Sequence, residues 1–136
     1  MSSYLYFNDG TNLEKNTKVE FTENSRKILE KRFLKRDDKG EIAETPEDMF
    51  NRIAEVIAEP DKPYRNAEFS KVEFYNLLSS RKFFPNAPTF TGAGTALGQL
   101  AACFVLPVSD DLGRYQDSIF STLRDAALIQ QSGGGN

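Results

Sequence analysis

The apolar run at residues 100–108, Leu-Ala-Ala-Cys-Phe-Val-Leu-Pro-Val, limits the possible folds more than any other stretch of this sequence. Its apolar residues occupy both odd and even positions, so an extended chain would present them on both faces of a sheet. Pro107, near the end of the run, disfavours a helix. We therefore predict a strand over residues 100–108 that is buried on both faces, as in a parallel sheet or barrel.

The stretch before this run, residues 85–98, has no hydrophobic period and contains two prolines and three glycines. We predict a loop there, and a loop of this length is often functional. The sequence Gly-Ala-Gly-Thr-Ala-Leu-Gly at 92–98 superficially suggests a phosphate-binding loop. However, the dinucleotide fingerprint requires a strand before its glycines, and the Lys-Ser/Thr pair of the P-loop is missing. Both motifs are therefore disfavoured.

Four helices are predicted from their start signals and their apolar spacing. The first opens at Thr22 and covers residues 22–36, and a turn follows at 37–41. The second has Thr45 as its cap and Pro46 in its first turn, and it ends at 59–63. The third covers 66–80, and the fourth begins near Asp117 and Ser118 and runs to 131. The predicted core residues of the first three helices are Ile28, Leu29, Phe33, Met49, Phe50, Ile53, Val56, Ile57, Phe69, Val72, Leu77 and Leu78.

Composition excludes several classes of function. The net charge is −3 with both signs mixed along the chain, which argues against a clustered basic face for nucleic acid. One cysteine and no histidine exclude a Cys/His metal site and an internal disulfide within these residues. No signal-peptide core and no run of eighteen apolar residues is present. We expect a soluble, cytoplasmic protein without nucleic-acid or membrane partners.

Cys103, the single cysteine, has two interpretations from the residues alone. It is either a buried packing residue or a thiol held at the edge of a site, and packing is favoured for a cysteine in such an apolar run. The Ser-Gly-Gly-Gly-Asn sequence at 132–136 would, taken alone, indicate a flexible tail.

Two long motifs change this balance. The sequence FFPNAPTFTGAGTALGQLAACFVLPV, followed by SIFSTLRDAALIQQSGGGN, resembles the N-terminal part of the catalytic chain of ribonucleotide reductases. It is most similar to the class II, adenosylcobalamin-dependent enzymes, and the similarity covers residues 19–136. The resemblance implies a mainly α fold with a short β component: a helical region at 1–84 leads, from residue 85 to 136, into the first strand and helix of a ten-stranded α/β barrel.

The resemblance also implies roles for individual residues. Cys103 would be one of two thiols that reduce the substrate, ending in a disulfide with a cysteine further along the full enzyme, while a third cysteine carries a thiyl radical. The remaining implied substrate-binding positions are Pro88, Thr89 and the backbone of Ala102 on one side of the nucleotide, and Ser132 and Gly133 on the other. Glycines at such positions let backbone N–H groups approach an anion.

Residues 109–120 correspond to a region of the family that helps to bind a deoxynucleotide effector at the dimer interface, and this stretch is longer than the usual family version. Of Asp110, Asp117 and Ser118, we rank Asp117 and Ser118 first as effector ligands, and an N-cap pair that opens the fourth helix is the alternative. Ala87 stands where the family usually has serine, so no side-chain role is transferred to it.

One cysteine cannot serve as both radical carrier and dithiol, so we expect an N-terminal fragment that is inactive alone. The expected partners are the C-terminal remainder of the reductase, a ribonucleotide substrate, a deoxynucleotide effector and a thioredoxin-like or other dithiol reductant. A dimer is implied for the full enzyme, and adenosylcobalamin would bind mainly outside this chain. Without the remainder, residues 100–108 would expose an apolar strand edge. A class I large-chain fragment and a non-catalytic helical interaction module stay open as alternatives.

Overall fold

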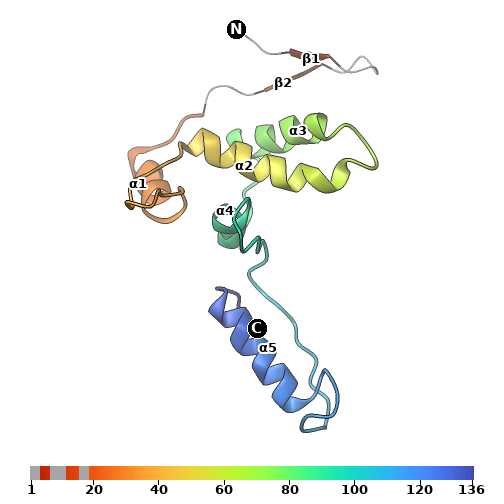
Figure 1. Ribbon diagram of the computed structural model, residues 1–136. Coiled ribbons are helices and arrows are strands. Elements are labelled where there is room, and N and C mark those ends of the chain that lie inside the picture. Colours follow the sequence, from red (N-terminus) through yellow and green to blue (C-terminus); the bar gives the residue numbers. More distant parts are fainter. Residues whose placement is uncertain (1–3, 7–11, 16–18) are drawn as a thin grey trace. The chain divides into compact units, whose positions relative to one another are not determined.

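The structure is a computed structural model that describes residues 4–6, 12–15 and 19–136. The chain divides into two compact units, Met1–Pro85 and Asn86–Asn136, and each is described by itself (Figure 1). The described residues are mainly helical with little strand. None of the helices in this part of the chain has the length and hydropathy needed to cross a bilayer.

The first unit begins with a two-stranded antiparallel sheet of β1 (Tyr4–Tyr6) and β2 (Asn12–Glu14), in which Tyr4 pairs with Glu14. This hairpin was not predicted from the sequence. Lys15, directly after β2, donates a hydrogen bond to Asn51 Oδ1 at 2.6 Å, and its Nζ lies 4.3 Å from the centre of the Tyr75 ring. Partial burial, followed by repulsion from Lys71, lowers the pKa of Lys15.

Helix α1 (Glu23–Arg32) starts as predicted, with the Thr22 side chain accepting a hydrogen bond from the Ser25 N–H at 3.2 Å. It ends four residues earlier than predicted. The turn predicted at 37–41 is confirmed, because one Asp37 carboxylate oxygen accepts hydrogen bonds from the backbone N–H groups of Lys39 and Glu41.

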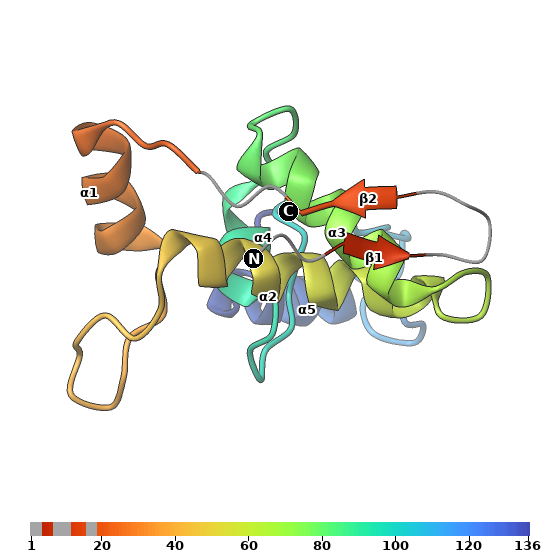
Figure 2. The ribbon, with the colours of Figure 1, turned by 90° about the horizontal axis from the view of Figure 1, so that it is seen from above.

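Helices α2 (Pro46–Ala58) and α3 (Ala67–Ser79) lie side by side and form the body of this unit, with the short helix η1 (Glu59–Asp61) after α2 (Figure 2). A reciprocal capping box opens α2: Thr45 Oγ1 accepts from the Asp48 N–H, and the Asp48 carboxylate accepts from the Thr45 N–H. The hydrogen bonds that the Asp48 carboxylate accepts from the Thr45 N–H and from the Thr45 hydroxyl lower the pKa of Asp48. The Asn66 side chain caps α3.

The core of this unit lies between α2 and α3. Of the predicted core residues, Leu29, Met49, Phe50, Ile53, Val72 and Leu78 are buried. Ile28 and Leu77 were predicted wrongly, since they are 52% and 40% exposed. Tyr75, which was not predicted, is buried and makes an edge contact with the Phe50 ring. The core is therefore narrower on α1 and richer in aromatic rings than the apolar spacing indicates.

A nearly buried ion pair joins the segment after α1 to α2. Arg52 donates to Glu44 through two nitrogens, at 2.7 and 3.1 Å, and both side chains are about one-tenth exposed. Glu44 also accepts a hydrogen bond from the Lys35 backbone N–H at 2.7 Å. The charges of Arg52 and Glu44 are tolerated at such low solvent exposure because the two side chains form several hydrogen bonds.

The second unit departs from prediction in two places. Helix α4 (Ala87–Gly92) occupies part of the predicted loop at 85–98, because Pro88 fits a first helical turn that needs no N–H donor. Residues 100–108 do not form a buried strand: the sole backbone bridge of this segment joins Cys103 to Gly135, and Val105 is 98% exposed. A strand requires neighbouring strands on its edges, and one residue pair does not supply them.

Helix α5 (Ile119–Gln131) confirms the fourth predicted helix. None of its residues is buried. The apolar side chains that this unit exposes include Val105, Val108, Leu112, Tyr115, Phe120, Leu123 and Leu128.

Candidate functional site

Cys103 and the glycine run at 133–135 lie side by side, although some thirty residues separate them in the sequence. The Gly135 N–H donates to the Ala102 carbonyl at 2.7 Å, and the Phe104 N–H donates to the Gly135 carbonyl at 2.8 Å. These two bonds place Cys103 opposite Gly135 in a parallel bridge. The Cys103 side chain is exposed, so its thiol is open to a reactant.

The glycine run ends α5 in a specific way. The Gly133 N–H bonds to the Gln130 carbonyl at 3.0 Å and the Gly134 N–H to the Ile129 carbonyl at 2.9 Å, which is the hydrogen-bond pattern of a Schellman motif. Gly133 has φ +85°, a conformation that favours glycine. A Cβ on Gly134 would lie 2.7 Å from the Ile129 side chain and 2.8 Å from the Phe104 ring. The run therefore turns the chain back against residues 102–104.

Gln99 links the same two segments through its side chain. The Ser132 hydroxyl lies 2.6 Å from Gln99 Oε1, and Gln99 Nε2 donates to the Ala101 carbonyl at 3.3 Å. No role for Gln99 was predicted from the sequence. The sequence shows a glutamine directly before the apolar run at 100–108, but this position does not indicate what its side-chain amide contacts.

The predicted substrate residues Pro88 and Thr89 lie on α4. Pro88 is half-buried, and Thr89 is only 7% exposed. The Thr89 hydroxyl is 2.9 Å from the Leu100 carbonyl and 2.9 Å from Asn86 Oδ1. It therefore connects α4 to the start of residues 99–104, which we call the cysteine segment. At the other end of α4, a Cβ on Gly92 would approach the Gln99 carbonyl oxygen to 1.9 Å. Glycine is required there because two pieces of backbone touch.

The candidate effector residues stand at the N-terminus of α5. Ser118 occupies the N-cap position but is fully buried, and its hydroxyl contacts Ser121 Oγ at 2.9 Å without capping the helix. Loop carbonyls take over the capping: Ile119 N–H donates to Asp111 at 2.8 Å and Phe120 N–H to Leu112 at 3.1 Å. These two amides are thus already used.

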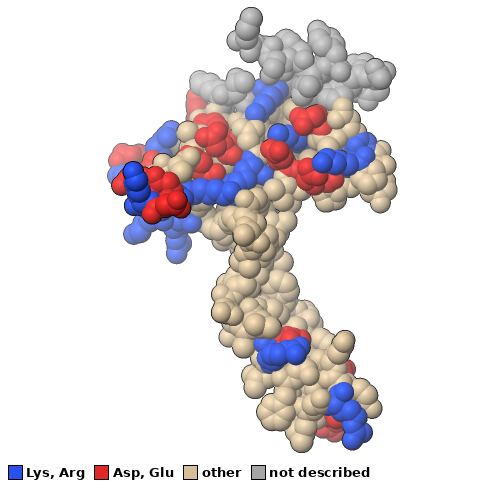
Figure 3. Space-filling model, viewed as in Figure 1, with Lys and Arg blue, Asp and Glu red and all other residues tan. Residues whose placement is uncertain are grey.

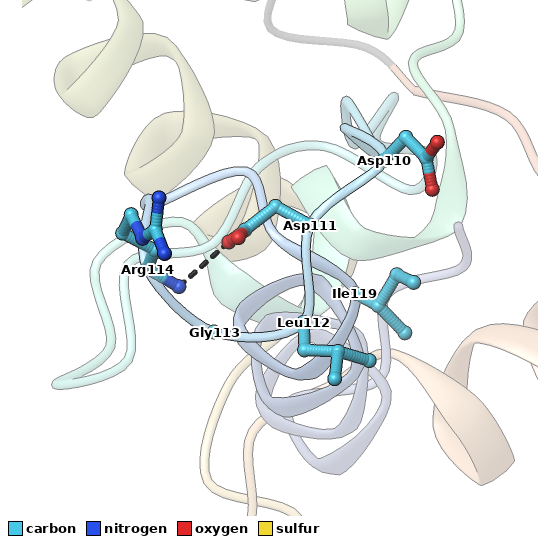
Figure 4. A pocket seen from close by; sticks show the side chains of 6 residues that line it. All are labelled: Asp110, Asp111, Leu112, Gly113, Arg114 and Ile119. Carbon is cyan, nitrogen blue, oxygen red and sulfur yellow. Dashed lines mark hydrogen bonds between the residues drawn. The ribbon is translucent and has the colours of Figure 1, made fainter.

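Asp117 is half-buried, and its backbone carbonyl accepts from the Ser109 N–H at 2.7 Å. It borders a cavity of about 420 Å³ whose lining also includes Leu106, Pro107, Gln116, Thr122 and Asp125. A second cavity of about 470 Å³ is formed by Asp110, Asp111, Leu112, Gly113, Arg114 and Ile119. There the Asp111 carboxylate accepts a hydrogen bond from the Arg114 backbone N–H at 2.6 Å (Figure 4). Asp117 therefore has open space beside it, whereas Ser118 does not.

Charge distinguishes the surfaces of the two units. Lysine, arginine, aspartate and glutamate are interspersed over α1, α2 and α3, while few charged side chains appear on the drawn face of the second unit (Figure 3). Within residues 4–6, 12–15 and 19–136, no three histidine, cysteine, aspartate or glutamate side chains gather as a metal site.

Residues 19–98 match the family model described as "Ribonucleotide reductase, all-alpha domain". A vitamin B12-dependent ribonucleoside-diphosphate reductase of Mycobacterium tuberculosis is 39% identical over 79% of this chain and 15% of its own length. One of Thermoplasma acidophilum with the same name is 31% identical over 86% of this chain and 22% of its own. The ribonucleoside-diphosphate reductase large subunit of Danio rerio is 37% identical over 80% of this chain and 12% of its own.

The helical first unit agrees with the all-alpha description of the matched family model. The chain belongs to the ribonucleotide reductase family, in the part that carries the all-alpha domain. Relatives named as vitamin B12-dependent and relatives named as large subunits both match it. The chain spans between 12% and 22% of the length of these three relatives.

Proposed function

We propose that this chain is the N-terminal part of the catalytic chain of a ribonucleotide reductase and that Cys103 is one of its two reducing thiols. The observation that carries the proposal is the pairing of Cys103 with Gly135, which holds an exposed thiol beside a glycine run. Because glycine has no side chain, a nucleotide can approach the backbone of such a run closely. A fixed backbone on both sides of the thiol provides the orientation that catalysis requires.

The chemistry balances with two thiols. Replacing the 2′-hydroxyl of a ribonucleotide by hydrogen takes two electrons and two protons, and it releases water while a thiol pair becomes a disulfide. Cys103 supplies one thiol, because the chain has a single cysteine. The second thiol and the radical-carrying cysteine belong to the rest of the enzyme, and a dithiol reductant of the thioredoxin type restores the pair.

Exposure and hydrogen bonding in the second unit support a proposal for the substrate and effector contacts. We assign the exposed Gly133 and the half-buried Ser132 and Pro88 to the ribonucleotide surface. The Thr89 hydroxyl and the Ala102 carbonyl serve it indirectly, because internal hydrogen bonds already use them. Asp117 borders a cavity and is the better candidate for a deoxynucleotide effector at a dimer interface.

The remainder of the reductase is the expected partner of residues 100–108 and of α5, whose apolar side chains are exposed. Two of the three relatives described above bear the name vitamin B12-dependent, which favours adenosylcobalamin as the radical source. Adenosylcobalamin would bind mainly outside this chain and would supply the radical there. A cytoplasmic location suits a thiol that must return to its reduced state.

The test is complementation. This chain is combined with a separately produced remainder of a class II relative, adenosylcobalamin, a dithiol and a ribonucleotide, and deoxyribonucleotide is measured. Activity should require both pieces, and Cys103→Ser should abolish it while Lys39→Ala, at an exposed position of the first unit, leaves it unchanged. Activity that survives Cys103→Ser would refute the redox assignment. A complex that is active only with a separate radical-generating subunit would indicate a class I enzyme. A complex inactive in both assays would indicate a non-catalytic helical module.

A further inference from the structure

Three consecutive backbone carbonyls before Cys103 each have a hydrogen-bond donor from a different part of the second unit. Leu100 is held by the Thr89 hydroxyl at 2.9 Å, Ala101 by Gln99 Nε2 at 3.3 Å, and Ala102 by the Gly135 N–H at 2.7 Å. Residues 100–104 are half-buried or exposed and none is buried, so apolar packing does not fix the segment. Its position is set by these hydrogen bonds.

Gln99 differs from the other two donors because its side chain contacts both strands of the bridge. Its Nε2 donates within the cysteine segment, while its Oε1 lies 2.6 Å from the Ser132 hydroxyl. Ser132 is the C-cap of α5, directly before the glycines that turn back toward Cys103. The amide therefore joins the end of α5 to the cysteine segment next to the backbone bridge, and it can do so only with a donor and an acceptor at its two ends.

We propose that Gln99 is a positioning residue for Cys103: its side-chain amide, bound to Ser132 and to the Ala101 carbonyl, holds the cysteine segment in register with the glycine run. The proposal rests on the proposed function for the purpose of the positioning, namely to keep the thiol beside the ribose. The geometric claim does not depend on that function. It predicts that loss of the amide loosens the pairing of Cys103 with Gly135 while the helices stay folded.

A disulfide measures this pairing directly, without substrate or the rest of the enzyme. Because Cys103 is the single cysteine, Gly135→Cys creates one possible intramolecular disulfide. A Cβ at position 135 would meet only the Ala102 carbonyl oxygen, at 3.6 Å, which is an ordinary contact. Oxidised glutathione is the oxidant: two protein thiols become one disulfide, and two molecules of reduced glutathione are formed. At equilibrium, the ratio of disulfide to dithiol protein at a known ratio of oxidised to reduced glutathione gives the effective concentration of one protein thiol with respect to the other.

In the Gly135→Cys chain, Gln99→Ala should lower this effective concentration by about tenfold, as expected for a hydrogen-bonded link. Ser132→Ala should have a similar effect, and the two changes together should lower it little further. Gln99→Glu keeps an acceptor for the Ser132 hydroxyl and should restore part of the loss. Gln131→Ala, at an exposed glutamine in the last turn of α5, is the matched control and should leave the value unchanged.

Circular dichroism on each variant separates positioning from folding. A Gln99→Ala chain with unchanged helix content and an effective concentration within about twofold of its parent would overturn the proposal. Fully additive effects of Gln99→Ala and Ser132→Ala would also overturn it. If Gln99→Ala loses helix content, Ser132→Ala and Gln99→Glu decide: the proposal fails if neither changes the effective concentration. Failure here would leave the complementation assay untouched, and failure of complementation would leave this measurement valid.

Discussion

Gly92→Ala is the substitution for which the structure gives the sharpest expectation. Gly92 is the last residue of α4 and is buried, and a Cβ added there would lie 1.9 Å from the Gln99 carbonyl oxygen and 3.0 Å from its carbon. Ordinary contact begins near 3.4 Å, so the two backbones would have to separate by about 1.5 Å. No side-chain rotation relieves this overlap, because the obstructing atoms belong to the main chain.

The expected cost is at the upper end of the range for an overpacked site, about 3 kcal/mol. At about 1.4 kcal/mol per factor of ten, this corresponds to a loss of roughly a hundredfold in local protection. The loss should reach residues 99–104, because movement of Gln99 carries the cysteine segment with it. Helix content in the first unit should stay as it is, since α2 and α3 have their own core.

Native-state hydrogen exchange is the assay, read at the amides of Ala93, Phe104 and Gly135, whose hydrogen bonds report on α4 and on the bridge. Gly113→Ala is the matched control, because a Cβ there meets nothing within 4 Å and no left-handed φ is required. The reasoning is refuted if Gly92→Ala and Gly113→Ala exchange these three amides at equal rates. Slower exchange in the second unit alone would also contradict it.

Three further changes test the packing elsewhere. Arg52→Met should destabilise the first unit by about 3–5 kcal/mol in urea unfolding, because it leaves the Glu44 carboxylate nearly buried and without its charged partner, and adding Glu44→Gln should recover part of that loss. Asp48→Asn should reduce the loss of unfolding free energy at acid pH. Hydrogen bonds from Thr45 lower the folded-state pKa of Asp48. The stabilisation from the Asp48 carboxylate is therefore present above its ordinary pKa and disappears as the pH falls through the lowered value. Wild type should therefore lose more stability than this variant between about pH 5 and pH 2, and equal slopes would contradict the capping argument. Thr89→Val should cost about 1–3 kcal/mol, because it keeps the side-chain shape but leaves the Leu100 carbonyl without its hydroxyl donor, and an unchanged urea midpoint would show that this hydrogen bond contributes nothing.

Helix starts could be predicted from the sequence because their determinants are local. Thr22, Thr45 and Asn66 each accept a hydrogen bond from a backbone N–H two or three residues away, so the cap and its partner appear in the same short stretch. The end of α1 could not be predicted in the same way. The chain leaves that helix where Leu34 becomes buried, and this burial depends on packing that the local spacing does not encode.

The strand predicted at 100–108 is wrong because, unlike a helix cap, a strand depends on partners that are distant in the sequence. Its apolar pattern describes burial on two faces, and burial requires partners that are distant in the sequence. Within the described residues, Gly135 is the one backbone partner in the bridge, and Val105 and Val108 stay exposed. Under the proposed function, the remainder of the reductase would supply these partners, so complementation by that remainder is the relevant test of the pattern.

The candidate site shows a similar division. The family resemblance selected Ala102, Cys103, Ser132 and Gly133, and the structure pairs Cys103 with Gly135, two residues after Gly133. It could not select Gln99, whose partner Ser132 lies 33 residues further along the chain. An amide becomes informative only when both of its ends have identified partners, and that requires the tertiary structure.

Folding alone explains two of the three glycines at 133–135. Gly133 needs its left-handed φ to end α5, and Gly134 has no space for a Cβ beside Phe104, so helix termination and packing explain both. Neither reason applies to Gly135, where the nearest atom to an added Cβ is at an ordinary 3.6 Å. Local structure therefore does not require glycine opposite Cys103. The proposed function would favour it, because a nucleotide can approach the backbone beside the thiol more closely where no side chain is present.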